Sequence, residues 1–222
     1  MREIFDAELK ALGDDLEAMA VRVEHAIAAA GRALATADLA LAESVIADDL
    51  AIDRLERQLD ERSIHLLAQQ QPVATDLRIV VSALRMSATL ERMGDLARHI
   101  AEVARGRYPR QAVPPALAGT FAEMDEAARR LARRIVTLLE SRDLALAESI
   151  ETDDDRLDDL HGDTFTAMLG GEWAGTPQQT VDVTLMGRYY ERFGDHGVSI
   201  ARRIVYLVTG DLSTSEPLHI HD

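Results

Sequence analysis

The chain is 222 residues long, which is enough for one large domain or two small ones. Its formal net charge at pH 7 is −15, so a surface that binds duplex nucleic acid directly is disfavoured, because every phosphate contact would form against a repelling background. Cysteine is absent, which excludes disulfides, thiolate metal sites and thiol nucleophiles, and a hydrophobic content of 47% excludes a wholly disordered chain.

Apolar residues recur at helical spacing along nearly the whole chain, and the alternating pattern typical of strands is nearly absent. The first stripe runs through Leu9, Leu12 and Leu16, with acidic residues mostly off it. Similar stripes follow as far as residue 210. The pattern predicts an all-α protein with six helices, at residues 2–35, 38–70, 73–106, 116–141, 143–170 and 177–210.

Polar caps, glycines and prolines mark the predicted helix ends. Asp38, Asp143 and Thr176 are predicted N-caps, and Gly106 and Gly210 stand where C-terminal caps are expected. The segment 107–115 contains three prolines and cannot be helical throughout. We therefore expect a first three-helix bundle at 1–106, a linker at 107–115, a second three-helix bundle at 116–210 and a polar tail at 211–222.

The two halves share sequence. Residues 38–44 recur unchanged as residues 143–149, and Glu-Arg-Met-Gly-Asp at 91–95 recurs as Glu-Arg-Phe-Gly-Asp at 191–195. An amphipathic helix alone would repeat residue classes rather than identities, so the matches indicate a duplication. The predicted architecture is two tandem, pseudo-repeated three-helix bundles.

Pairs of carboxylates four residues apart occur in both halves, and a spacing of four places each pair on one helix face. The repeat keeps this spacing in the second and third helices of each half, and antiparallel packing would bring the pairs together. Oxygen-rich sites of this kind suit a hard metal cation. The candidate metal ligands are Asp49, Asp53, Glu91, Asp95, Asp154, Asp158, Glu191 and Asp195.

Two other interpretations of the carboxylates remain open. Neighbouring arginines such as Arg92 and Arg188 could neutralise them within the helix, or the acids could form a solvated face. A register one residue later in the second half, beginning at Asp155, is discarded because it maps onto Leu50 and not onto an acid. Gly94 and Gly194, at the same motif position, suggest close approach of helices or access to the acidic face, and packing inherited through the duplication is an equal alternative.

Other residues point away from catalysis. The sequence has no Glu-x-x-His, which argues against a ferritin-like di-iron site, and no phosphate-binding glycine loop or nucleophile elbow. We expect His196 to be an ordinary helix residue and Trp173 to anchor a loop. His219 and His221 in the tail could bind a stray transition metal, although a disordered tail is preferred. No catalytic residue, organic cofactor or enzymatic activity is predicted.

No apolar run approaches the roughly 20 residues that span a bilayer, and acidic residues interrupt the N-terminal segment. We therefore expect no transmembrane helix and no signal peptide. The expected location is the cytoplasm, with any membrane contact made only peripherally through partners.

With these motifs the sequence resembles the PhoU family of phosphate-specific transport accessory and regulatory proteins. The resemblance covers nearly the whole chain and rests on Asp49-x-x-x-Asp53, on residues 71–78 (Gln-Pro-Val-Ala-Thr-Asp-Leu-Arg) and on both Glu-Arg-x-Gly-Asp segments. The second half departs from the pattern, because residues 175–182 keep only a proline and a later acid.

The resemblance implies a homodimeric, cytoplasmic negative regulator of phosphate uptake and of the phosphate-starvation response. Such a regulator would contact the ATPase of the phosphate transporter and a sensor histidine kinase, and would not bind nucleic acid directly. It also implies that iron, zinc, manganese or magnesium ions bind the eight candidate carboxylates. A metal-storage or metal-buffering protein and a non-catalytic helical scaffold are the alternatives.

Overall fold

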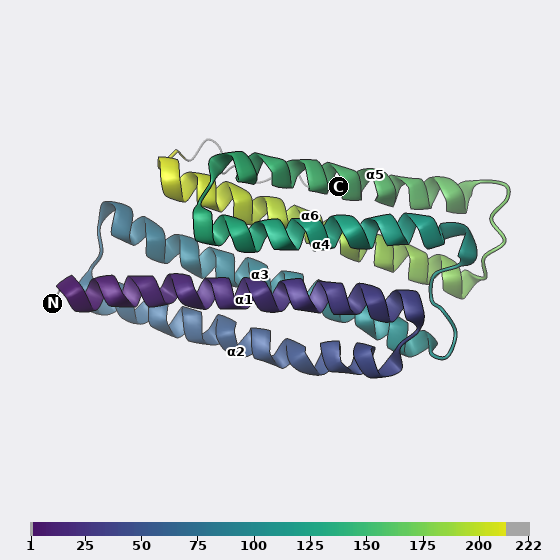
Figure 1. The fold of residues 1–222 in the computed structure, drawn as a ribbon, viewed down its shortest axis with the longest axis horizontal. Coiled ribbons are helices and arrows are strands. Elements are labelled where there is room, and N and C mark those ends of the chain that lie inside the picture. Colours follow the sequence, from purple (N-terminus) through teal and green to yellow (C-terminus); the bar gives the residue numbers. More distant parts are fainter. Residues whose placement is uncertain (1, 212–222) are drawn as a thin grey trace.

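The computed structural model describes residues 2–211, and within that range it contains six α-helices, one short 3-10 helix and no strand. Each long helix runs antiparallel to the one before it (Figure 1). The helices are α1 (Arg2–Thr36), α2 (Leu39–Gln70), α3 (Ala74–Arg107), η1 (Pro115–Leu117), α4 (Ala118–Ser141), α5 (Leu144–Leu169) and α6 (Pro177–Thr209).

The helices form two bundles of three. Helices α1, α2 and α3 pack against one another, and α4, α5 and α6 do the same. The predicted all-α class and tandem three-helix bundles are therefore confirmed. The predicted tail lies almost wholly outside the described residues, as do His219 and His221.

Polar side chains cap the N-terminal ends of α2, α5 and α6. The Asp38 carboxylate accepts a hydrogen bond from the Leu41 backbone N–H at 3.0 Å, and Thr176 forms a capping box with Gln179. The cap predicted at Gly106 is wrong, because α3 continues to Arg107 and ends before Tyr108. The residue that follows Tyr108 is proline, and a proline disfavours helical backbone at the residue before it.

Equivalent helices of the two halves pack against each other. Helix α1 contacts α4 and α3 contacts α6, and both pairs run antiparallel (Figure 1). Helices α2 and α5 make their main contacts with helices of their own half and lie on the two outer sides. The two halves therefore face each other across an approximate twofold axis, as two subunits of a dimer would.

Large apolar side chains fill the space between the helices. Leu12, Met19 and Ile27 on α1 are fully buried, and so are Leu131 on α4 and Tyr190 on α6. Burial of such side chains supplies the main stabilising contribution, roughly 1.5–3 kcal/mol for each one. Among the helices of residues 2–211, none is long and apolar enough to cross a membrane.

A buried carboxylate joins α4 to α5. Asp153 is 3% exposed and accepts hydrogen bonds from Arg130 Nε at 2.7 Å and from Arg134 Nη1 at 2.6 Å. Arg134 Nη1 also donates to the Ser149 carbonyl at 2.7 Å. Two guanidinium groups thus neutralise one desolvated carboxylate, which fixes the register of the two helices.

Replacing Asp153 with asparagine should lower the free energy of unfolding by about 1–3 kcal/mol, because the negative charge between Arg130 and Arg134 is lost and an NH2 donor replaces one of the two acceptor oxygens. For a chain of this size the melting temperature should fall by roughly 2–4 °C per kcal/mol. Thermal unfolding followed by circular dichroism measures the change. Asp155→Asn is the matched control, because Asp155 is exposed. Equal melting temperatures for the two variants would contradict the role of Asp153.

Candidate functional site

The eight predicted carboxylates form two acidic clusters at equivalent places in the two halves. The first acidic cluster lies between α2 and α3 and consists of Asp49, Asp53, Glu91 and Asp95. The second acidic cluster lies between α5 and α6 and consists of Asp154, Asp158, Glu191 and Asp195. In each cluster, members from both helices raise the pKa of their neighbours, so the pairs lie close together as the repeat predicts.

Two glycines allow the outer helix of each half to approach. A Cβ atom at Gly94 would lie 2.8 Å from Cδ1 of Ile52, and one at Gly194 would collide with the Asp154 carboxylate. A side chain at either position would therefore displace the facing side chain of α2 or α5. The predicted close approach of helices at Gly94 and Gly194 is confirmed.

Arginine neutralises the first acidic cluster. Arg98, on α3, places Nε 2.7 Å from Asp49 Oδ2 on α2 and Nη2 2.6 Å from Asp95 Oδ1. Its Nη1 donates to Glu102 at 2.8 Å. Burial opposes the charge of Arg98, but the hydrogen bonds to Asp95 and Glu102 outweigh it and raise the pKa of the guanidinium. Burial raises the pKa of Asp49, and the Arg98 charge opposes that increase.

The second acidic cluster lacks this arginine. In the alignment of 91–95 with 191–195, the place of Arg98 is taken by Val198, which is 1% exposed. Arg188 donates to Glu191 Oε1 at 2.5 Å, but Glu191 Oε2 and Asp154 Oδ1 are buried without a hydrogen-bond partner. Asp154 is only 7% exposed. The two halves therefore share a set of acids but not the counter-charge.

Burial and crowding of like charges disturb the acids of the second cluster. Burial, followed by the charges of Asp158 and Asp195, raises the pKa of Asp154 to about 7. Burial and Asp195 raise the pKa of Glu191 to about 7 against the opposing charge of Arg188. These carboxyls therefore hold protons near neutral pH where ordinary carboxyls do not.

The two clusters fit a metal ion differently. Arg98 already occupies carboxylate oxygens of Asp49 and Asp95, so the first cluster does not suit a cation as it stands. The second offers two buried oxygens without partners, which is the donor chemistry that a hard cation requires. Across residues 2–211, no three acidic or histidine side chains lie close enough together to hold one metal ion.

Four other residues considered in the sequence analysis lie outside the second acidic cluster: Asp155, Asp159, Trp173 and His196. Asp155 and Asp159, the discarded register, are exposed. Burial, then the charges of Arg192 and Arg92, lower the pKa of His196 to about 4, so its imidazole is neutral. Trp173 donates from Nε1 to Thr180 Oγ1 at 3.0 Å, which anchors the loop between α5 and α6 as predicted.

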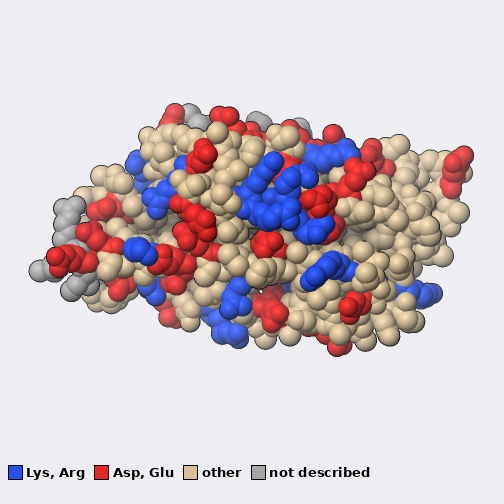
Figure 2. All heavy atoms as spheres, in the orientation of Figure 1, with Lys and Arg blue, Asp and Glu red and all other residues tan. Residues whose placement is uncertain are grey.

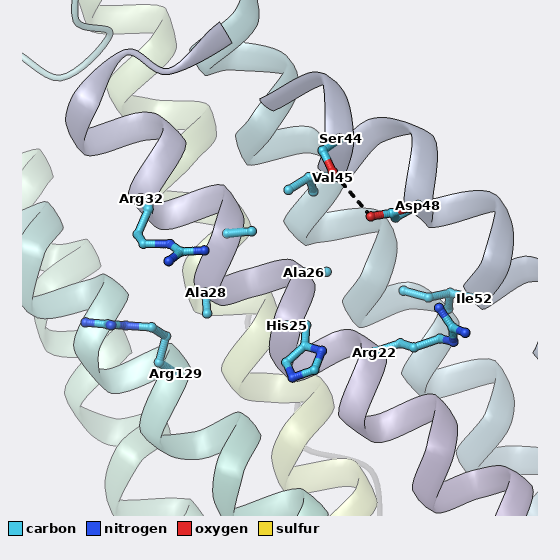
Figure 3. A pocket seen from close by; sticks show the side chains of 11 residues that line it. Arg22, His25, Ala26, Ala28, Arg32, Ser44, Val45, Asp48, Ile52 and Arg129 are labelled. Atoms are coloured by element: carbon cyan, nitrogen blue, oxygen red, sulfur yellow. Dashed lines mark hydrogen bonds between the residues drawn. The ribbon is translucent and has the colours of Figure 1, made fainter. Parts of the chain in front are cut away.

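A hollow of about 390 Å³ lies over α1, away from both acidic clusters. Figure 3 shows Arg32 and Arg129 in the space between α1 and α4, while Arg22 extends toward Ile52 on α2. The floor includes alanines of α1, and none of the eight candidate carboxylates lines it. The hollow and the acidic clusters are therefore separate features.

Comparison with known proteins identifies the family. The sequence profile of the PhoU domain matches residues 16–104 and again residues 121–204, one match in each half. The chain belongs to the PhoU family.

Relatives align with the chain over almost their whole length. A phosphate-specific transport system accessory protein PhoU homolog 2 of Mycobacterium bovis is 42% identical over 210 residues, which cover 95% of this chain and 99% of that protein. A PhoU homolog of Rhizobium meliloti is 34% identical over 212 residues, 93% of this chain and 87% of that protein.

Two solved structures share the fold. PhoU of Pseudomonas aeruginosa superposes with a TM-score of 0.82 at 30% identity, covering 93% of this chain and 100% of that one. The phosphate transport system regulatory protein PhoU of Streptococcus pneumoniae gives a TM-score of 0.84 at 25% identity, covering 94% of this chain and 98% of that one.

In metal-free protein, the second cluster should reduce stability as the pH rises. The pKa of Asp154 increases from 3.8 to about 7 on folding, so the folded state binds more protons than the unfolded state between those pH values. Asp154→Asn removes this titration, so its melting temperature should fall less than that of wild type from pH 4 to pH 8. Thermal unfolding in a chelator across that range tests the difference.

The control for this experiment is Glu148→Gln, also on α5, which should follow the wild-type pH profile because Glu148 is exposed. Parallel profiles for wild type and Asp154→Asn would contradict the raised pKa.

Proposed function

We propose that this PhoU-family protein regulates a phosphate transporter, and that it restrains phosphate uptake and the phosphate-starvation response. The observation that carries the proposal is the alignment with a phosphate-specific transport system accessory protein over 95% of this chain and 99% of that protein. A fold shared with the phosphate transport system regulatory protein of Streptococcus pneumoniae supports the same role.

The protein acts by binding rather than by catalysis. Its proposed partners are the ATPase subunit of the transporter and a sensor histidine kinase, both reached from the cytoplasm as a homodimer. Bundles of long helices offer extended, rigid faces to such partners. A physical route to inhibition is that the two bundles hold the ATPase in a conformation that does not transport.

Deleting the gene should raise phosphate uptake in phosphate-rich medium, and a plasmid copy should restore the wild-type rate. Uptake of radiolabelled phosphate, together with a starvation-response reporter, measures both effects. Unchanged uptake and reporter activity in the deletion strain would contradict the proposal.

Adding purified protein should lower the turnover of the transporter ATPase. Unchanged turnover would contradict the idea that the bundles hold the ATPase in a conformation that does not transport. Light scattering tests the dimer.

We further propose that the second acidic cluster binds iron, zinc, manganese or magnesium. The unpartnered buried oxygens of Asp154 and Glu191 favour the second cluster, where Asp158 and Asp195 would complete the ligand set. When bound, the cation would supply the positive charge that Arg98 supplies in the first cluster. The metal is thus an accessory of the fold and takes part in no reaction.

The number of bound metal ions should depend on which carboxylates lack an arginine partner. Asp154→Asn combined with Glu191→Gln should abolish binding, because it replaces the two carboxylates that carry the unpartnered oxygens with uncharged amides. Arg98→Val, which copies the residue of the second half, should add a site by freeing Asp49 and Asp95. Equilibrium dialysis against Mn²⁺ followed by elemental analysis gives ions per chain, and Arg133→Val is the control.

Equal metal content in wild type, the double variant and Arg98→Val would contradict the metal proposal. Many tightly bound ions per chain would instead favour the metal-storage alternative. If metal content and regulation both stay unchanged when Glu91, Asp95, Glu191 and Asp195 are replaced together, the scaffold alternative is favoured.

A further inference from the structure

An arginine-rich seam runs between the halves where the first part of α3 meets the last part of α6. The two helices are antiparallel, so contacts pair Arg78 with Tyr206 near one end and Arg107 with Asp182 at the other. Residues at positions 78, 82 and 85 share one face of α3, because they are separated by four and then three residues. The arginine seam is defined as Arg78, Ser82, Arg85, Arg203 and Tyr206.

Three positive charges gather in the seam. The Cζ atoms of Arg78 and Arg203 each lie 5.8 Å from the centre of the Tyr206 ring, so two guanidinium groups share one aromatic side chain. Burial and the charge of Arg85 both lower the pKa of Arg203. The ring offers a cation–π attraction but does not cancel any charge.

No carboxylate neutralises these arginines within residues 2–211. None of the three guanidinium groups has a hydrogen bond or ion pair to an acidic side chain there. Within the seam, Nε of the Arg78 guanidinium and Oγ of Ser82 are buried without a hydrogen-bond partner. Buried polar groups in folded proteins are nearly always hydrogen-bonded, so a group of donors without acceptors requires an explanation.

The arginines of α4 provide the contrast. In Figure 2, basic side chains gather over the middle of α4, which carries Arg129, Arg130, Arg133 and Arg134. Every one of these four arginines has an acidic partner. The partners are Asp125 and Glu126 on α4 and Asp153 on α5. The clustered arginines of α4 are therefore neutralised by acids, whereas the arginines of the seam have no acidic partner within residues 2–211.

We propose that the arginine seam binds a phosphate-type oxyanion, either inorganic phosphate or the phosphate group of an organic phosphate. A guanidinium fork matches two oxygens of such an anion, and a dianion would relieve the repulsion between Arg85 and Arg203. Arg78 and Arg85 belong to the first half and Arg203 to the second, so the bound anion would tie the halves together. Binding of an anion in the seam does not depend on the proposed role in transport.

The test is the effect of anions on thermal unfolding and on calorimetric binding, with full-length, metal-free protein at constant ionic strength. Phosphate, pyrophosphate and ATP are added separately, with sulfate and chloride as comparison ions. At least one of the phosphate compounds should raise the melting temperature of wild type more than sulfate or chloride does. The compound that binds most tightly identifies the source of the phosphate group.

Arg85→Gln is the informative variant, because Arg85 is exposed and its loss should not prevent folding. It should weaken phosphate binding about tenfold or more, since one charged donor is removed. Arg203→Gln should have a similar effect. Arg133→Gln, an exposed arginine of α4 paired with Glu126, is the control and should bind as wild type does.

A second measurement needs no ligand. If the seam carries uncompensated positive charge, Arg85→Gln should raise the melting temperature in a chloride buffer, whereas Arg133→Gln should not. Unweakened binding by Arg85→Gln, or equal stabilisation of wild type by sulfate and phosphate, would overturn the inference. Either result would leave the role in phosphate transport unaffected, because that role rests on the family match.

Discussion

Both halves depend on the neutralisation of buried carboxylates, and the ion pairs that Arg98 makes with Asp49 and Asp95 are the clearest example. A carboxylate held between packed helices needs a positive partner, because its burial otherwise costs several kcal/mol. The first half meets this need within the chain, through one guanidinium that joins α2 to α3. Asp153 meets it through Arg130 and Arg134 across α4 and α5. The second acidic cluster has no equivalent partner for Asp154, and protonation or a cation must take its place.

The arginine seam poses the same problem with the opposite sign. Arg78, Arg85 and Arg203 lie between α3 and α6, and the described chain provides no acid for them. The second acidic cluster, with its unpartnered Asp154, and the arginine seam thus lie at separate places, although the chain as a whole is strongly acidic. Separation of this kind prevents the two groups from neutralising each other within the fold.

Local signals explain why so much of the fold could be predicted from the sequence. Helix bounds lie within two residues of prediction because caps such as Asp38 and Thr176 act on adjacent backbone. The internal repeat predicted which eight carboxylates lie in equivalent places of the two halves. The reach of Arg98 to Asp49 could not be predicted, because it depends on which face of α3 turns toward α2. The arginine seam depends on the register between α3 and α6, which come from different halves.

The approximate twofold relation between the halves has a consequence for how this molecule could diverge. Two identical subunits must change together, because one gene encodes both copies of every position. Here the two copies are joined in one chain, so arginine stands at position 98 and valine at the equivalent position 198. A covalently joined pair can thus specialise its two sides, with one kept closed and self-sufficient while the other stays responsive to its surroundings.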